Sequence, residues 1–416
     1  MALELHEDAL ARLAGASGDG AAMAMRLVCD SARLLNAPSL VQVASAHIDG
    51  ALYHGDSGTL FAERLQELGA RVAIRSTLNV GALDLTGCST NRLPTHERDM
   101  AKRLMKAYMA LGCEPSWTCS PYQAGHRPAL GSDVAWGESN AVVFCNSVLG
   151  ARTNRYGDYL DIACAISGFA PKVGLHLPEN RLATFVFDVS GLPLASFTEE
   201  SFWPILGSLY GKRAGTAIGV VKGVPVHPGE DALKAFGAAS ASTGGVGLFH
   251  IAGVTPEAPD VETILGGKTP LEIMHIVDTD FAEQKKRMAT VQGITHIDAV
   301  AIGSPHLSLE ECQRLDRLIA GRKLTVPFYA CTGRHVLKDL ESLGVRKSLE
   351  LAGVTVVIDT CVVVTPIMKE LASGVLMTNS GKFAQYAPGN TGYGVVFGSM
   401  RECVESAVSG TPAYVG

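Results

Sequence analysis

The fold of this chain is decided by the stretch VPFYACTG (326–333), in which an apolar run ends in Cys331, Thr332 and Gly333. A run that is apolar throughout is typical of a strand buried on both faces of a parallel sheet. Similar stretches stand on either side of it, AVAIGSPH (299–306) and VTVVIDTC (354–361), and helical patterns separate them. Strands that alternate with helices in this way predict an α/β fold with parallel sheets.

The length of 416 residues predicts several domains with a large buried core. The 45 glycines indicate many tight turns between strands and helices. We expect an N-terminal α/β domain over residues 1–192, a middle α/β domain over 193–294, and a C-terminal parallel α/β domain over 295–416.

Composition excludes several classes of protein. The net charge is −6 and no basic stripe is visible, which argues against a nucleic-acid partner. No apolar run reaches the length of a membrane span, and the first residues (MALELHEDALARL) are acidic and amphipathic, unlike a signal peptide. We therefore expect no membrane partner and a cytoplasmic location. The ten cysteines include no CxxC pair, so zinc ribbons and thioredoxin-type redox motifs are excluded.

Polar residues fall at the carboxyl ends of successive predicted strands. Open α/β sheets bind their ligands at that edge, so these residues are candidates for a site. They are Ser304, His306, Cys331, Thr332, Cys361, Asn379, Ser380 and Lys382.

A second polar region runs from Trp117 to Arg155 and clusters hydroxyls, amides, a carboxylate, a thiol and guanidinium groups. It lacks the regular apolar spacing of a packing element, so we interpret it as a site loop. The alternative is a long polar surface loop.

Three thiols, those of Cys119, Cys331 and Cys361, are placed where they could converge. Converging thiolates suit an iron–sulfur cluster that lacks one protein ligand. The alternative is that Cys331 and Cys361 are core residues at strand ends. Arg152, Arg155 and Lys382 could bind a carboxylate or a phosphate, or could belong to an ordinary solvated face. No GxGxxG, GxSxG or HExxH motif occurs, so nothing supports a nucleotide-binding, serine-hydrolase or zinc-protease reading.

Several segments together resemble the large subunit of the aconitase X family. They are TCSPY (118–122), WGESNAVVFCNSVLGARTNR (136–155), GLHLPENR (174–181), ACTGRHV (330–336), DTCVVV (359–364) and MTNSGKFAQYAPG (377–389). The resemblance implies an aconitase-like fold, with three α/β units around a central cleft. The swivelling domain of the superfamily is expected to be absent from this chain. It would then be a separate small subunit of the same enzyme.

The resemblance also implies the residues of the site. Cys119, Cys331 and Cys361 would hold an iron–sulfur cluster, either [4Fe-4S] or [2Fe-2S]. Catalytic roles would fall to Glu138, Ser147 and Lys382, and substrate binding to Asn146, Arg152, Thr153, Asn154 and Ser380. Cys145 departs from the small residue that the family pattern suggests, and it leaves a spare thiol close to the site.

The activity implied by the resemblance is dehydration of a small hydroxy acid, by iron-assisted loss of hydroxide. Two substrates are known in the family, and we expect cis-3-hydroxy-L-proline rather than mevalonate 5-phosphate. Glu138 would be a counter-charge for a ring nitrogen and would repel a phosphate. The general base would be a serine of the swivelling domain. A non-enzymatic iron–sulfur sensor or scaffold is the alternative, but it would not need the anion-binding Arg152 and Lys382.

Overall fold

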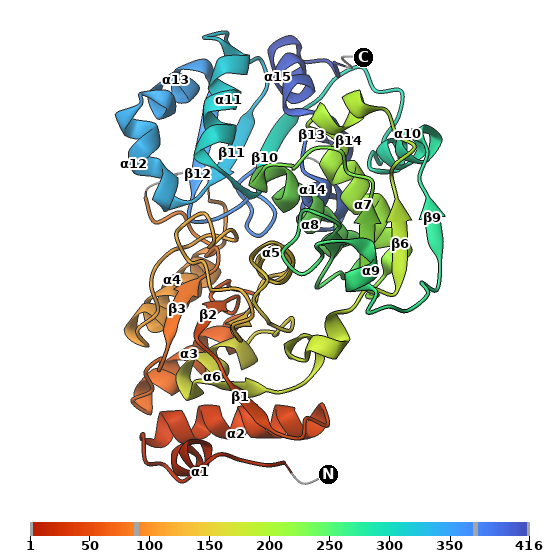
Figure 1. The fold of residues 1–416 in the computed structure, drawn as a ribbon. Helices are drawn as coiled ribbons and strands as arrows, with labels where there is room; N and C mark the ends of the chain where they lie inside the picture. Colours follow the sequence, from red (N-terminus) through yellow and green to blue (C-terminus); the bar gives the residue numbers. More distant parts are fainter. Residues whose placement is uncertain (1–2, 87–90, 369–372, 414–416) are drawn as a thin grey trace. The chain divides into compact units, whose positions relative to one another are not determined.

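The structure is a computed structural model that describes residues 3–86, 91–368 and 373–413 (Figure 1). Its chain forms two compact units. Unit 1 comprises residues 1–83, 93–182 and 255–257, and unit 2 comprises residues 84–92, 183–254 and 258–416. The described residues form three parallel sheets, one in unit 1 and two in unit 2. The prediction of an α/β fold with three parallel sheets is therefore confirmed.

Unit 1 contains the parallel sheet β3 (Arg75–Leu78), β2 (Ser45–Ile48) and β4 (Ala135–Trp136), with β2 in the centre. A short antiparallel pair lies beside it, β1 (Leu40–Gln42) with β5 (Phe169–Pro171). All four residues of β2 are buried, as expected for a central parallel strand. The helices of this unit are α1 (Glu7–Leu13), α2 (Asp19–Leu34), α3 (Asp56–Glu67), α4 (Thr95–Ala110), α5 (Ser139–Phe144) and α6 (Leu160–Ser167).

The region between Trp117 and Arg155 is not a continuous loop. Ser139 starts α5, and a π-helical turn over Cys145–Leu149 follows it directly. The helix begins there because the Glu138 carboxylate accepts the backbone N–H of Ala141 and so caps the first turn. The polar region therefore carries a buried helical segment as well as loops.

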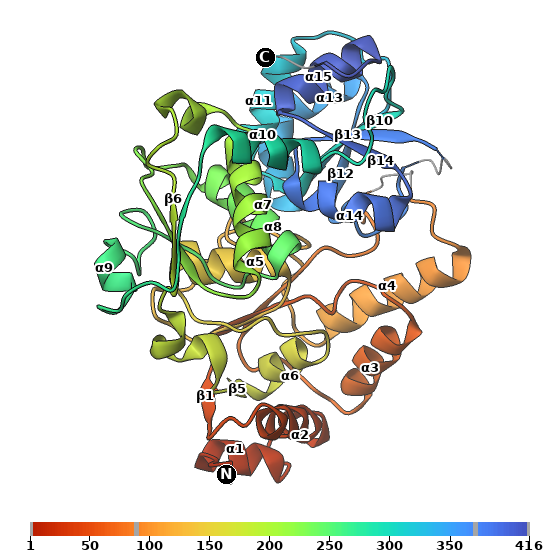
Figure 2. The ribbon, with the colours of Figure 1, turned by 90° about the vertical axis from the view of Figure 1, so that its right-hand side faces the viewer.

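The first sheet of unit 2 has the order β8 (His250–Ile251), β7 (Gly219–Lys222), β6 (Phe185–Asp188) and β9 (Ile273–His275). Helices α7 (Phe202–Ala214) and α8 (Glu230–Gly244) lie on one side of β6, and the short α9 (Val261–Ile264) lies on the other (Figure 2). A Cβ atom on Gly207 would lie 2.2 Å from the carbonyl oxygen of Phe236, so glycine permits the close approach of α7 and α8. Since β6 pairs with β7, this sheet includes residues before the predicted boundary at 192/193. Helix α10 (Asp278–Arg287) follows β9.

The second sheet of unit 2 has the order β12 (Val354–Ile358), β11 (Phe328–Thr332), β10 (Ala299–Leu307), β13 (Val375–Thr378) and β14 (Gly394–Phe397). One face packs on α11 (Leu309–Ile319), α12 (Arg334–Ser342), α13 (Val345–Ala352) and α15 (Met400–Ser409) (Figure 1). The other face packs on α14 (Gly381–Thr391) and on the segment 361–368. Side chains alternate between the faces along each strand, so Ala330 faces the first layer and Cys331 the second.

In the part of the chain that the structure describes, no helix has both the length and the apolar character that crossing a membrane requires.

Candidate functional site

Cys331 and Cys361 lie together in unit 2. Cys331 is near the end of β11, Cys361 follows β12, and both are buried on the same face of the sheet. The hydrogen bond with the Cys331 side chain holds the pKa of the Cys361 thiol below its ordinary value, although burial opposes this. Two thiols in contact, one of them biased toward the thiolate, are a donor set that fits an iron–sulfur cluster.

The backbone next to these cysteines is tightly packed. Gly303 has a φ of +90°, and a Cβ atom there would lie 2.1 Å from the carbonyl oxygen of Cys331. The Cys361 thiol lies 4.0 Å from the carbonyl oxygen of Gly303. Glycine at this position therefore lets β10 approach the two cysteines.

Cys119, the third predicted ligand, belongs to unit 1, where it is buried in the turn after Trp117. The side-chain amide of Asn140 donates to the carbonyl oxygen of Cys119 at 2.9 Å and to the Tyr122 hydroxyl at 3.2 Å. Among the residues described, no three His, Cys, Asp or Glu side chains are grouped as metal ligands. The three-cysteine ligand set stays a prediction.

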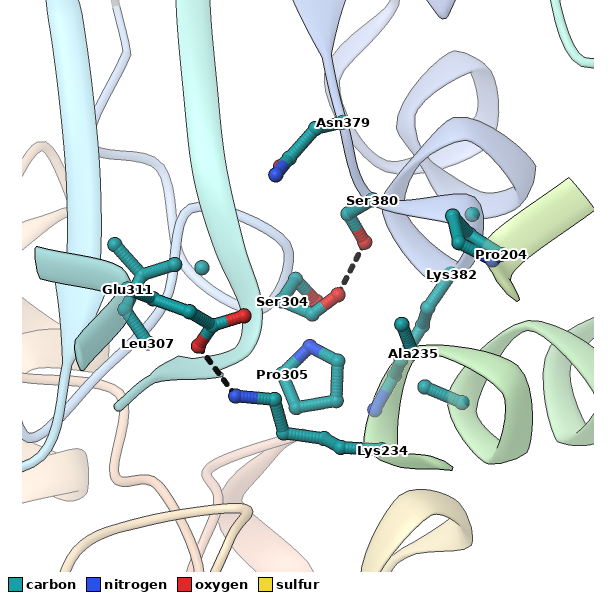
Figure 3. Close-up of a pocket in the computed structure, with 13 residues that line it drawn as sticks. Pro204, Lys234, Ala235, Ser304, Pro305, Leu307, Glu311, Asn379, Ser380 and Lys382 are labelled. Atoms are coloured by element: carbon teal, nitrogen blue, oxygen red, sulfur yellow. Dashed lines mark hydrogen bonds and ion pairs between the residues drawn. The ribbon is translucent and has the colours of Figure 1, made fainter. Parts of the chain in front are cut away.

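A cavity of about 40 Å³ lies in unit 2 beside the start of α14 (Figure 3). Its lining includes the predicted Ser380 and Lys382, together with Ser304 and Asn379. The Ser380 hydroxyl caps α14 by accepting the backbone N–H of Phe383 at 2.9 Å, and it donates to the carbonyl oxygen of Ser304. Hydroxyls, an amide and a lysine at a helix N-terminus are a setting in which an anion is stabilised.

A buried lysine that sequence reasoning missed, Lys234 of α8, lines the same cavity. Its ammonium group donates to Asp231 Oδ1 at 2.8 Å and to the carbonyl oxygen of His306 at 3.2 Å. It also donates to Glu311 Oε2 (Figure 3). The Ser308 hydroxyl donates to the other Asp231 oxygen at 2.6 Å. The only sequence signal for this network is the Ser308 and Glu311 capping box, which the structure also contains.

His306 is held as a neutral ring in the same region. Burial lowers its pKa to about 3, and its Nε2 lies 3.0 Å from the carbonyl oxygen of Thr360. A carbonyl oxygen can only accept, so this nitrogen carries the proton and Nδ1 does not. This hydrogen bond holds Thr360, the residue before Cys361, in place.

Three predicted substrate-binding residues of unit 1 use their side chains in hydrogen bonds to backbone groups. Asn146 bonds both the N–H and the C=O of Thr153, at 3.0 and 2.9 Å. Thr153 accepts the backbone N–H of Trp136 at 3.0 Å, and Asn154 accepts that of Leu175 at 2.8 Å. These contacts hold the loop in shape. Roles of Asn146, Thr153 and Asn154 toward a substrate stay predictions.

The remaining predicted residues of unit 1 differ in exposure. Glu138 and Ser147 are buried, and Glu138 has a φ of +67°. Arg152 is partly buried, and its Nε atom lacks a hydrogen-bond partner. Arg155 is exposed.

A buried polar relay crosses the sheet of unit 1. The Thr77 hydroxyl lies 2.9 Å from His47 Nδ1 and 2.7 Å from His126 Nδ1, and both rings pack against Trp136. Burial lowers the pKa of each histidine to about 3, so both rings are neutral. A hydroxyl can donate to only one nitrogen, so at least one ring donates its own Nδ1 proton and presents a bare Nε2.

Comparison with known proteins gives matches along almost the whole chain. Three family models match: aconitase X first domain over residues 2–179, second domain over 183–286 and third domain over 297–409. A cis-3-hydroxy-L-proline dehydratase from Pseudomonas aeruginosa is 40% identical over 405 residues, which are 96% of this chain and 69% of that protein. A phosphomevalonate dehydratase large subunit from Methanothermobacter thermautotrophicus is 35% identical over 390 residues, 92% of this chain and 93% of that one.

A solved structure is also similar. The crystal structure of Thermococcus kodakaraensis aconitase X, in its holo-form, superposes with a TM-score of 0.85 at 30% sequence identity. The match covers 97% of this chain and 100% of that chain.

Proposed function

Because this chain belongs to the aconitase X family, we propose that it removes water from cis-3-hydroxy-L-proline to give a pyrroline-2-carboxylate. The chain is a hydro-lyase, since the similar proteins are dehydratases. The observation that supports this proposal best is the cavity of unit 2, which is lined by Ser380 and Lys382. It lies at the edge of the sheet where the Cys331 and Cys361 thiols meet. The 40% identity to a dehydratase of that substrate supports the choice of substrate.

We propose that Cys119, Cys331 and Cys361 hold an iron–sulfur cluster. The contact between the Cys331 and Cys361 thiols and the lowered pKa of Cys361 support this donor set. When bound, such a cluster supplies a Lewis-acidic iron that makes the substrate hydroxyl a better leaving group.

The reaction breaks the C2–H and C3–O bonds of the substrate, forms a C2=C3 double bond and releases water. The Δ2 product formed in this way can tautomerise to the Δ1 form. We propose that Lys382 and the Ser380 region bind the carboxylate and the negative charge that develops on it as the proton leaves C2. Arg152 is proposed as a further carboxylate ligand, because its Nε atom has no hydrogen-bond partner.

For unit 1 we propose Glu138 as the counter-charge of the ring nitrogen, and Ser147 as a hydrogen-bond partner of the substrate. The buried position of both side chains supports a role that excludes water.

A further domain is proposed to supply the base that takes the C2 proton. Relatives named large subunits imply a second subunit in those enzymes, whereas the Pseudomonas relative is longer than the matched region. We propose a separate small subunit for this chain as well. Cytoplasmic location stays a prediction of the sequence.

The deciding experiment is an assay of the protein, with its iron restored and the candidate small subunit added, on both family substrates. We expect turnover of cis-3-hydroxy-L-proline and its loss in Lys382→Ala. Mevalonate 5-phosphate is the second candidate, because large subunits that dehydrate phosphomevalonate are up to 35% identical. Turnover of that compound alone would reverse the choice of substrate. Iron content is measured in parallel, and Cys331→Ala and Cys361→Ala are each expected to reduce it.

A further inference from the structure

The cavity of unit 2 has room for one small charged group. A buried water needs at least about 10–15 Å³ of such space, so a volume of about 40 Å³ suits one small group of a ligand and not a whole substrate molecule. A carboxylate has three heavy atoms, and a phosphate group has five. The smaller carboxylate therefore fits such a cavity more easily.

The charges around the cavity decide how strongly it attracts an anion. Two lysines, Lys234 and Lys382, line it. The ammonium group of Lys234 is bonded to Asp231 and Glu311, and its side chain is only 3% exposed. With Lys382 included, two positive charges stand against two negative ones, and the formal sum of these four groups is zero.

Two histidines and one paired glutamate in this region do not change that sum. His306 and His335 are neutral, because burial lowers their pKa values to about 3 and about 4. Glu200, which accepts from Asn379 of the cavity wall at 2.9 Å, is matched by Arg314 at 3.0 Å. The formal charges of these groups therefore cancel, so the cavity attracts a second negative charge on a ligand only weakly, although two lysines line its wall.

We propose that Asp231 and Glu311 are specificity-determining residues, which neutralise Lys234 so that the cavity accepts a monocarboxylate and rejects a phosphate dianion. This inference rests on the proposed function, because it states which group of the substrate, a carboxylate and not a phosphate, this cavity binds. Neither residue needs to touch the substrate. Both act through Lys234, whose charge would otherwise add to that of Lys382.

The physical argument gives a quantitative expectation. The Coulomb energy between the site and a ligand scales with the ligand's charge, so removing one negative charge from the site acts twice as strongly on a dianion. The fold-gain in affinity for a dianion should therefore be about the square of that for a monoanion. For Glu311→Gln we expect roughly threefold tighter acetate and about tenfold tighter phosphate at low ionic strength.

The test measures binding of acetate and of inorganic phosphate to the full chain by NMR line broadening, at mildly alkaline pH, where phosphate is a dianion. The variants are Glu311→Gln and Asp231→Asn. The glutamine can still accept the Ser308 backbone N–H that Glu311 accepts at 2.8 Å, so the helix cap is kept. Glu350→Gln is the matched control, since Glu350 pairs with Arg346 on the surface and does not line the cavity.

We expect the wild-type protein to bind acetate at least as tightly as phosphate. Each network variant should gain more for phosphate than for acetate, and Glu350→Gln should change neither. The inference is overturned if wild-type protein prefers phosphate, or if the network variants behave like Glu350→Gln. Failure of the proposed function would be seen separately, as absence of hydroxyproline turnover by a protein that still shows this binding pattern.

Discussion

Arg181 offers the sharpest test of how unit 1 holds its polar loops. The residue is 2% exposed, and its guanidinium reaches both a carboxylate and several carbonyl groups. It pairs with Glu257 through Nε and Nη2, and it also donates to the side chain and the carbonyl of Asn146. Further donations go to the carbonyl oxygens of Ala151 and Leu175. Replacing it by methionine removes every one of these donors and keeps the apolar stem.

The expected cost follows from what the change leaves behind. Removing one partner of a buried ion pair costs about 3–5 kcal/mol, because the other charge stays buried without compensation. The Glu257 side chain is 21% exposed, so water screens part of that penalty. We therefore expect Arg181→Met to lower the free energy of unfolding of unit 1 by about 3 kcal/mol.

Urea denaturation followed by tryptophan fluorescence is a suitable assay. Two of the three tryptophans, Trp117 and Trp136, belong to unit 1, and both are fully buried. Arg64→Met is the matched control, because Arg64 pairs with Glu67 at 3.1 Å on an exposed helix face and its loss should cost within about 0.5 kcal/mol. A loss below about 1 kcal/mol for Arg181→Met, or one equal to that of the control, would refute the reasoning.

Three further outcomes are expected. Unit 1 should lose stability as the pH falls from 6.5 toward 3, by up to about 2.7 kcal/mol per pH unit. The reason is that His47 and His126 have folded pKa values near 3, so in this range only the unfolded chain takes up their two protons. A urea midpoint that stays constant between neutral pH and the onset of carboxylate titration would contradict this. Thr77→Val should cost about 2 kcal/mol of unfolding free energy because both Nδ1 atoms lose their hydroxyl partner, whereas Thr77→Ser should stay close to wild type in the same assay. Gly303→Ala should cost at least about 2 kcal/mol in thermal or urea unfolding, and Gly321→Ala, which shares the positive φ but has nothing within 4 Å of the added Cβ atom, should cost less.

The sequence predicts the C-terminal sheet well because each of its strands carries its own signal. An apolar run buried on both faces is recognisable without knowledge of its neighbours, and β10, β11 and β12 all have one. The rule that parallel strands end at one edge then brings Cys331 and Cys361 to the same region, as the structure confirms.

Other features could not be predicted because their cause lies far away in the chain. Lys234 forms a buried ion pair with Glu311, which lies 77 residues later in the chain. No pattern in the sequence around Lys234 predicts that partner. The apolar run from Ala141 to Phe144 is too short for its periodicity to separate a strand from a helix, and the cap from Glu138 makes it part of a helix. The resemblance implied Asn146 at the substrate. Its bonds to Thr153, through both ends of its amide, could not be predicted from the sequence, and its role toward a substrate stays a prediction.

Unit 1 is discontinuous in sequence, because the three residues Thr255–Glu257 belong to it although they follow most of the middle sheet. The carboxylate that neutralises Arg181 is thus synthesised 76 residues after the arginine itself. When the first 182 residues have been translated, Arg181 is present but Glu257 is not. We therefore expect the nascent chain to complete its first unit only after residue 257 has left the exit tunnel, and a fragment that ends before this point to be less stable than the same residues within the whole chain.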